Sequence, residues 1–322
     1  MSETVTIGSV RAQPGTVASG FLNVTVRPDG SPLGLPVIIV NGASPGPKLC
    51  VNACVHGDEY EGVEAIFRLV KMLDPKKFKG TLIVVPAVNV PAYEAGTRVS
   101  MIDHLNMNRV FPGKPEGMIT EQIAHIFITQ IVSKVKYLVD LHSAGMVQVL
   151  LPLAIYEEAP TVGKASFEIA RAFGTEFLWK SPGYPNTLGG EATKMSVAGT
   201  TIEMAGEGRA REEDVKIALK GILNVLKHLG MIEGRPDIPQ KALAFEGAWG
   251  YSKHGGFLRP AVKMGEKVVK GQLLGTIVNL LGEEVERDVA PYDGIIAGIR
   301  TFPKISPGDW NFFVGKIIGE VA

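Results

Sequence analysis

Apolar residues along the first two thirds of the chain follow two periods, which predict alternating strands and helices. Short apolar runs predict strands at residues 35–40, 49–55, 81–88, 137–141, 147–155 and 200–204. Apolar positions three or four residues apart predict helices at residues 59–73, 118–135, 161–173 and 212–229. Strands that alternate with helices are typical of α/β folds with a mostly parallel sheet. We therefore expect a mixed, largely parallel sheet covered by helices, after a β-rich segment at residues 1–34.

The pattern changes near residue 239, where the helical period stops. From there to residue 322 the chain has short apolar runs separated by glycines, which is typical of a small all-β domain. The chain has 322 residues, and single hydrophobic cores stop growing at roughly 250–300 residues. We therefore expect an α/β domain over residues 1–238 and a β domain over residues 239–322.

The charge balance argues against large charged partners. Lys and Arg together number 33, as do Asp and Glu, so the formal net charge is zero. A neutral chain has no long-range attraction to nucleic acid or to a membrane surface, and a small-molecule substrate fits better. The N-terminus has no signal-peptide pattern, and no apolar run reaches the ~18 residues that a membrane span needs. We expect a cytoplasmic protein.

The two cysteines, Cys50 and Cys54, both lie in the predicted strand 49–55. Their spacing does not suit a zinc pair, and a disulfide along one strand has poor geometry. We therefore expect both to be buried side chains that pack as small apolar groups.

Side chains of the kind that bind metals follow two of the predicted strands. His56 and Glu59 come directly after strand 49–55, and His142 follows strand 137–141. Open α/β sheets bind ligands beyond the carboxyl ends of their strands, so we expect these side chains to converge. Two histidines and one glutamate, with the fourth position left to water, form a known catalytic zinc set. Zinc in such a site lowers the pKa of its water to about 7.

A His-x-x-Glu pair is a weak signal by itself, and its alternative role is on the surface or in capping a helix. The strand-end setting and the second histidine favour the metal. Glu203, near the end of strand 200–204, is the candidate general base, with Glu207 as its rival and a salt-bridged strand end as its alternative role. Asp140 could orient a ligand, whereas Asp58 has no expected role beyond a favourable negative charge at a helix start.

A long segment rich in Asn, Pro, Gly and Arg, residues 89–117, joins the two groups of candidate ligands. Loops of this length in compact domains are usually functional or disordered. Of Arg98 and Arg109, one could polarise a scissile carbonyl and the other could hold a substrate carboxylate together with the Asn108 amide. The alternative is a solvated loop with incidental charges.

Four motifs, in this order along the chain, resemble the succinylglutamate desuccinylase/aspartoacylase family. They are His56-Gly57-Asp58-Glu59, Asn108-Arg109-Val110-Phe111-Pro112-Gly113, Asp140-Leu141-His142-Ser143 and Ile202-Glu203. That family is similar to the zinc carboxypeptidases in fold and site, so the resemblance implies a zinc-carboxypeptidase-like three-layer sandwich. Four motifs in order are far more specific than any one of them.

The resemblance also implies a role for each candidate residue. Zinc would be held, one ion per chain, by His56, Glu59 and His142. Glu203 would be the general base, while Asn108 and Arg109 would bind the carboxylate of the amino-acid part of the substrate. Arg98 is the best match to the arginine that stabilises the tetrahedral intermediate, although its spacing from Asn108 is looser than in aspartoacylase.

The C-terminal segment resembles the barrel-sandwich domain of biotinyl and lipoyl carriers, at residues 262–274 and 289–296. Those carriers need a lysine that can be modified at the tip of a hairpin. The corresponding tip, residues 279–283, has no lysine. We therefore interpret this segment as an accessory domain that shapes or covers the mouth of the active site, and not as a carrier module.

These resemblances imply a zinc-dependent deacylase, which hydrolyses the amide of an N-acetyl or N-succinyl amino acid to a carboxylate and a free amino acid. The chain length and the carrier-like tail look closer to bacterial deacylases, such as N-acetyl-diaminobutyrate deacetylase, than to mammalian aspartoacylase. The alternative is a metallocarboxypeptidase that acts on short peptides. A homo-oligomer is compatible with either function.

Overall fold

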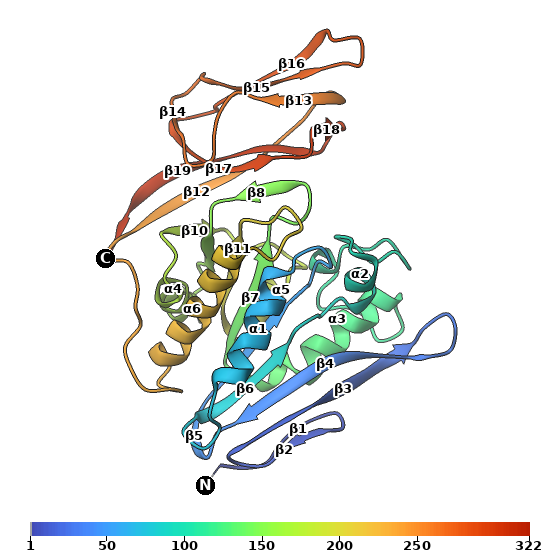
Figure 1. Cartoon of the computed structure of the whole chain (residues 1–322), viewed down its shortest axis with the longest axis vertical. Coiled ribbons are helices and arrows are strands. Elements are labelled where there is room, and N and C mark those ends of the chain that lie inside the picture. The colour runs from blue at the N-terminus through green and yellow to red at the C-terminus, as the bar shows by residue number, and fades with distance from the viewer. Residues whose placement is uncertain (1) are drawn as a thin grey trace.

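The computed structural model describes residues 2–322 and has a mixed α/β fold built on one large mixed sheet (Figure 1). The elements before residue 239 are β1 (Val5–Ile7), β2 (Val10–Ala12), β3 (Thr16–Val26), β4 (Pro32–Asn41), β5 (Ser44–Ala53), α1 (Glu61–Met72), β6 (Lys79–Val85), α2 (Val90–Ala95), η1 (Met107–Arg109), α3 (Ile119–Gln130), η2 (Val132–Lys134), β7 (Tyr137–Ser143), β8 (Gln148–Leu150), β9 (Leu153–Glu157), α4 (Gly163–Phe173), β10 (Phe177–Ser181), α5 (Leu188–Lys194), β11 (Ala198–Met204) and α6 (Glu212–His228). The strands that follow are β12 (Ala242–Tyr251), β13 (Gly256–Pro260), β14 (Lys267–Val268), β15 (Leu273–Val278), β16 (Glu284–Val289), β17 (Gly294–Arg300), β18 (Lys304–Ile305) and β19 (Trp310–Val321). Within residues 2–322, no helix is both long and apolar enough to cross a membrane.

Parallel strands form the middle of the large sheet. Its strand order is β14-β17-β19-β12-β10-β9-β11-β7-β5-β6-β4-β3. β6, β5, β7 and β11 are neighbours that run in the same direction. β9 is antiparallel to β11, and β10 and β12 are then parallel to β9. The expectation of a mixed sheet is confirmed. The three pairings among β6, β5, β7 and β11, at the centre of the sheet, are all parallel.

Helices cover both faces of the parallel strands, and each face has its own apolar core. Helices α1, α4 and α6 pack on one face, where Ile66 and Ile222 are fully buried. Helices α3 and α5 pack on the other face, where Phe127 is fully buried. Successive residues of a strand point to opposite faces, so Cys50 joins one core and Val51 the other. Both cysteines of the chain are free and buried, as predicted.

The strands after residue 239 extend the large sheet, and they form the upper part of the molecule in Figure 1. β12 pairs in parallel with β10, and β19 pairs with both β12 and β17. A second sheet, with the order β16-β15-β13-β18, contributes to a separate core that includes Leu258, Ile277 and Phe312. Residues 239–322 contain strands and no helix, as the glycine-rich pattern predicts. The large sheet nevertheless continues across the predicted boundary at residue 239.

Several local features differ from the sequence prediction. The apolar run 147–155 forms two strands, β8 and β9, with Pro152 between them, because proline cannot donate a hydrogen bond to a sheet ladder. The long segment 89–117 contains the short helix α2 and the 3-10 turn η1. Strand β10 and helix α5 were not predicted, because each is short and mixes polar with apolar residues.

Helices α4 and α6 meet closely at Gly221. A Cβ atom at this position would clash with the ring of Phe173. We expect Gly221→Ala to lower the free energy of unfolding by about 1–3 kcal/mol, because overpacking outweighs the better helix propensity of alanine. Urea unfolding measures the change, with Lys220→Ala as the control at an exposed position of the same helix. A Gly221→Ala variant as stable as the parent would contradict this account of the helix contact.

Candidate active site

Three neighbouring strands bring the candidate residues to one edge of the sheet. β5, β7 and β11 are parallel, so their carboxyl ends lie at the same edge. His56 follows the end of β5, and His142 lies at the end of β7. Glu203 on β11 is in register with His142 across the ladder. Side chains that are far apart in the sequence are therefore adjacent in the fold.

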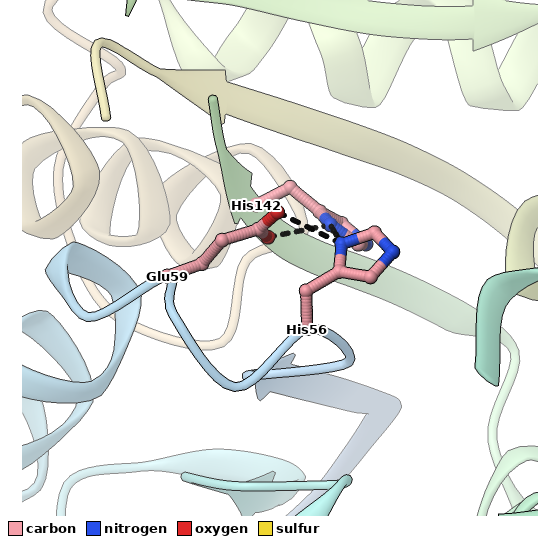
Figure 2. A group of neighbouring side chains, drawn as sticks. All are labelled: His56, Glu59 and His142. Carbon is pink, nitrogen blue, oxygen red and sulfur yellow. Dashed lines mark hydrogen bonds and ion pairs between the residues drawn. The ribbon is translucent and has the colours of Figure 1, made fainter. Parts of the chain in front are cut away.

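Figure 2 shows that His56, Glu59 and His142 point toward one another. Each offers a donor atom, and these atoms lie within 4.8 Å of one another. Nδ1 of His56 lies 2.8 Å from Glu59 Oε1, and Nδ1 of His142 lies 2.8 Å from Glu59 Oε2. The two Nδ1 atoms are 3.2 Å apart. Tetrahedral zinc with bonds of 2.0–2.1 Å separates its donor atoms by about 3.3 Å, so the spacing suits such an ion.

Buried polar groups orient His142. Its Nε2 lies 3.0 Å from Asp140 Oδ2, and Asn52 Nδ2 donates to the other oxygen of Asp140 at 2.6 Å. With Nε2 engaged, the Nδ1 atom of His142 faces the candidate metal position. This is the orienting arrangement that metal-binding histidines usually have. Asp140 therefore lies where the sequence analysis placed a group that orients a ligand, and Asn52 adds a support that was not predicted.

Burial and neighbouring charges control the protonation of the three candidate ligands. Burial and the Arg98 guanidinium lower the pKa of His56 to about 4. Burial opposes ionisation of Glu59, but His56 and His142 outweigh it and hold the pKa of Glu59 well below its ordinary range. Burial also opposes a charge on His142, but Asp140 and Glu59 raise its pKa well above the ordinary value. Because metals bind neutral histidine, a metal ion would displace a proton from His142.

Glu203 has unmet hydrogen-bonding capacity beside the candidate ligands. Its Oε2 is buried and has no hydrogen-bond partner within residues 2–322. Burial raises the pKa of Glu203 to about 8, although the His142 imidazole acts in the opposite direction. A carboxyl group with a raised pKa is suited to accept and return a proton near neutral pH. The rival base, Glu207, pairs instead with Arg211 at 2.9 Å.

The loop after β6 brings Arg98 and an unpredicted asparagine to the three candidate ligands. Nη1 of Arg98 lies 3.1 Å from Glu59 Oε1, and its guanidinium lies over the Trp310 ring, 5.7 Å from the centroid. The side-chain oxygen of Asn106 lies 3.2 Å from Nε2 of His56, so it orients this ring. Nothing in the local sequence separates Asn106 from the other asparagines of the loop.

Asn108 and Arg109 also reach the site, and both contribute to the lining of the same pocket. The side-chain oxygen of Asn108 accepts a hydrogen bond from the Leu188 amide at 2.8 Å. Burial lowers the pKa of Arg109, with the Arg98 guanidinium acting in the same direction. Arg109 remains open to solvent at the mouth of the pocket, where its guanidinium can meet an anionic ligand.

The candidate residues open onto a pocket of about 450 Å³. Strands β9, β10 and β11 supply part of its wall, and Trp249, Tyr251 and Trp310 of the C-terminal strands supply another part. Trp249 and Trp310 stack with an interplanar angle of 8°. The sequence analysis named none of these aromatic residues, because they lie more than a hundred residues from the metal motif and carry no local signal.

Asp58 differs from its expected role at a helix start. Helix α1 begins at Glu61, so Asp58 precedes it by three residues. The Asp58 carboxylate accepts a hydrogen bond from the Met146 amide at 3.0 Å. It therefore holds the turn that follows His142 against the turn that carries His56.

Comparisons with known proteins identify the family of this chain. Residues 45–229 match the model of the succinylglutamate desuccinylase/aspartoacylase catalytic domain. The chain is 32% identical over 324 aligned positions to N-alpha-acetyl-L-2,4-diaminobutyric acid deacetylase of Halomonas elongata, covering 94% of this chain and 92% of that protein. This chain belongs to the succinylglutamate desuccinylase/aspartoacylase family.

Two solved structures resemble this chain over almost its full length. A succinylglutamate desuccinylase from Silicibacter sp. TM1040 has a TM-score of 0.88 and 26% identity, covering 97% of this chain and 100% of that chain. The product-bound ectoine utilization protein EutE (DoeB) from Ruegeria pomeroyi has a TM-score of 0.87 and 28% identity, covering 98% and 99%. The C-terminal strands therefore belong to a fold that this chain shares with both structures.

The turn that carries His56 packs against the loop after β6 through Gly57. A Cβ atom on Gly57 would clash with the backbone of Ala92, and the Gly57 amide donates to the Thr97 carbonyl at 3.0 Å. We expect Gly57→Ala to lower the free energy of unfolding by about 2–4 kcal/mol, because backbone atoms cannot rotate away from the added methyl group. Urea unfolding checks this, with Gly319→Ala as the control because nothing lies within 4 Å of a Cβ there. Equal losses in both variants would show that Gly57 is not specially constrained.

Proposed function

We propose that this chain is a zinc-dependent deacylase that hydrolyses the amide bond of an N-acyl amino acid, giving a carboxylate and a free amino acid. The observation that carries the proposal is the convergence of His56, Glu59 and His142 beside a pocket that Glu203 also lines, with no hydrogen-bond partner for Glu203 Oε2 within residues 2–322. The relative from Halomonas elongata is named for a reaction of this class. The enzyme would thus be an amidohydrolase of linear amides.

The donor set fits zinc better than a harder cation. Zinc accepts two imidazole nitrogens and one carboxylate oxygen in a tetrahedral site with one open position, whereas magnesium and calcium prefer oxygen ligands alone. We propose one ion per chain on His56, Glu59 and His142. Bound zinc would polarise the scissile carbonyl and lower the pKa of a water molecule to about 7.

Glu203 transfers the proton in this proposal. Its carboxylate takes a proton from the attacking water and gives it to the amide nitrogen as the C–N bond breaks, so the amine leaves in a neutral form. The free Oε2 of Glu203 supports this role, because no other group in residues 2–322 competes for it. A divalent cation nearby would favour the charged form and lower the pKa of about 8 toward the range of a base at neutral pH.

The two arginines have separate tasks. Arg98 is held between Glu59 and Trp310, so its guanidinium is fixed near the carbonyl oxygen on which negative charge develops. Arg109 binds the carboxylate of the amino-acid part of the substrate through a charge-assisted contact. Asn108 assists through its amide NH2 group, since its side-chain oxygen is engaged by Leu188.

For the substrate, we propose an N-acetyl amino acid of the kind that the Halomonas elongata relative is named for, acetylated 2,4-diaminobutyrate. The product-bound protein from Ruegeria pomeroyi is named for ectoine utilization, and its chain is similar to this one over almost its full length. A metallocarboxypeptidase is less favoured, because Trp249, Tyr251 and Trp310 wall the pocket and leave little room for a peptide. Hydrolysis of short peptides in preference to acyl amino acids would reverse this choice.

Loss of one ligand should release the metal. We expect His56→Ala to reduce bound zinc from about one ion per chain to well below half an ion, because two remaining ligands hold zinc weakly. Elemental analysis after dialysis measures this, and His228→Ala is the control because it removes an exposed histidine at the end of α6. Full zinc content in the His56→Ala protein would contradict the ligand assignment.

Loss of the base should separate metal binding from turnover. We expect Glu203→Gln to keep its zinc and to lower kcat by about 10²–10⁴-fold, the range that general acid–base groups contribute. Steady-state kinetics on an N-acetyl amino acid, with zinc content measured on the same sample, tests this. Glu207→Gln is the matched control and should leave kcat within a few fold. Near-parental turnover in the Glu203→Gln enzyme would remove Glu203 from the reaction.

A further inference from the structure

Glu157 is a second carboxyl group in the pocket, and the proposed reaction does not use it. It ends strand β9, and its side chain lines the same pocket as His142 and Glu203. On this strand Leu153 is in register with Glu203, so Glu157 lies four residues farther along. At 3.3 Å per residue this is roughly 13 Å along the strand, which places Glu157 away from the candidate metal position.

Side-chain alternation directs Glu157 to the face that carries Glu203. Residues in register on neighbouring strands share a face, and Glu157 is in register with Ser181 on β10. Ser181, Trp179 and Thr201 line the pocket as well. One face of the sheet therefore lines the pocket from Glu203, the proposed general base, to Glu157.

No cation of the protein neutralises Glu157. Within residues 2–322, no lysine, arginine or histidine nitrogen lies within 4.0 Å of its carboxylate, whose side-chain hydrogen bond comes from the Thr193 hydroxyl at 3.2 Å. Lys180, on the neighbouring strand, pairs with Glu158, and Lys194, next to Thr193 in the sequence, pairs with Glu191. Burial raises the pKa of Glu157, since it disfavours the charged form.

Two glycines allow the backbone to pack against this carboxylate. A Cβ atom on Gly189 would lie 3.1 Å from Glu157 Oε1, and one on Gly183 would lie 3.3 Å from Oε2. Both distances are tighter than usual contacts for a Cβ atom. Side chains at either glycine would crowd the carboxylate and the pocket beside it.

The arginines of the pocket do not pair with Glu157. Arg98 and Arg109 belong to the loop after β6, whereas Glu157 ends strand β9, and neither guanidinium lies within 4.0 Å of its carboxylate. A partly buried carboxylate without a positive charge beside it is unfavourable, and a positively charged ligand relieves this. Trp179, in register with the residue two before Glu157, adds an aromatic face that attracts cations.

We propose that Glu157 binds a positively charged amine on the side chain of the substrate, so that the enzyme selects N-acyl derivatives of diamino acids. This inference rests on the proposed deacylase function and deepens it. The substrate then spans the pocket, with its carboxylate on Arg109, its acyl group beside Glu203 and its ammonium group on Glu157. A substrate with a neutral side chain of the same length would occupy the same space but would bring no positive charge to the Glu157 carboxylate.

The test compares two substrates that differ in charge and not in length, and adds two longer cations. Steady-state kinetics are measured on Nα-acetyl-2,4-diaminobutyrate and on neutral Nα-acetylnorvaline, whose side chains have the same number of heavy atoms, and also on the longer Nα-acetylornithine and Nα-acetyllysine. We expect the parent enzyme to favour at least one cationic substrate over the neutral one by roughly 10–100-fold in kcat/KM, the range of a charge-assisted hydrogen bond. Glu157→Gln should abolish this preference and leave kcat/KM for Nα-acetylnorvaline within a few fold.

The neighbouring Glu158→Gln is the matched control. Glu158 is exposed and pairs with Lys180, so its loss should leave the preference intact. No preference in the parent enzyme, or a preference that survives Glu157→Gln, would overturn the inference. If no acyl amino acid is hydrolysed, the proposed function fails separately. Calorimetry with free 2,4-diaminobutyrate and with neutral 2-aminopentanoate of the same length then decides the role of Glu157. Selective binding of the cation that Glu157→Gln abolishes supports the role, and any other result overturns it.

Discussion

The parallel pairing of β5, β7 and β11 is the constraint on which the site depends. Its ladders align Asn52 with Asp140 and, two residues farther along β7 on the same face, His142 with Glu203. A slip of one residue would turn these side chains to opposite faces of the sheet, so the register fixes which groups meet. Parallel strands also require crossover connections, which leaves room after β5 and β6 for the segments that carry His56 and Arg98.

The same edge of the sheet concentrates buried negative charge. Asp58, Glu59, Glu61 and Asp140 are each at most 5% exposed. Burial raises the pKa of Glu61 to about 7 and also raises the pKa of Asp58, so this concentration is unfavourable for the folded chain. Active sites often carry such local conflicts, which the rest of the fold compensates. A divalent cation on the proposed ligands would relieve the charge, which links the stability of this edge to the proposed chemistry.

The C-terminal strands complete the pocket because they belong to the same sheet. β12 is hydrogen-bonded to β10, so the wall that begins at β11 continues through β9 and β10 into the C-terminal segment. Trp249 and Trp310 thereby reach the pocket, and Trp310 also fixes the guanidinium of Arg98. A separate domain on a flexible linker would not hold an aromatic ring against an arginine in this way. The pocket is therefore bounded on one side by the family's catalytic region and on the other by strands outside residues 45–229.

Local patterns in the sequence predicted the alternation of strands and helices, the change to an all-β pattern near residue 239, and the family. These are local properties, since periodicity and short motifs are read within windows of about ten to twenty residues. The sequence also pointed to His56, Glu59 and His142, because each stands at a strand end, and the general rule for parallel sheets brings strand ends together. Short elements such as β10 and α5 were not predicted, because they contain too few residues to show a clear apolar period.

The remaining residues around the pocket could be identified from the folded arrangement alone. Asn52, Asn106 and Glu157 look like ordinary polar residues in the sequence, and they gain their roles from the strand register and from the packing of one loop. The aromatic wall depends on the pairing of β12 with β10, which joins residues more than sixty positions apart. Long-range pairing of this kind leaves no trace in a local pattern, because the same short segment fits many partners. The sequence therefore marked the metal-binding candidates, and the three-dimensional arrangement of the sheet defined the pocket around them.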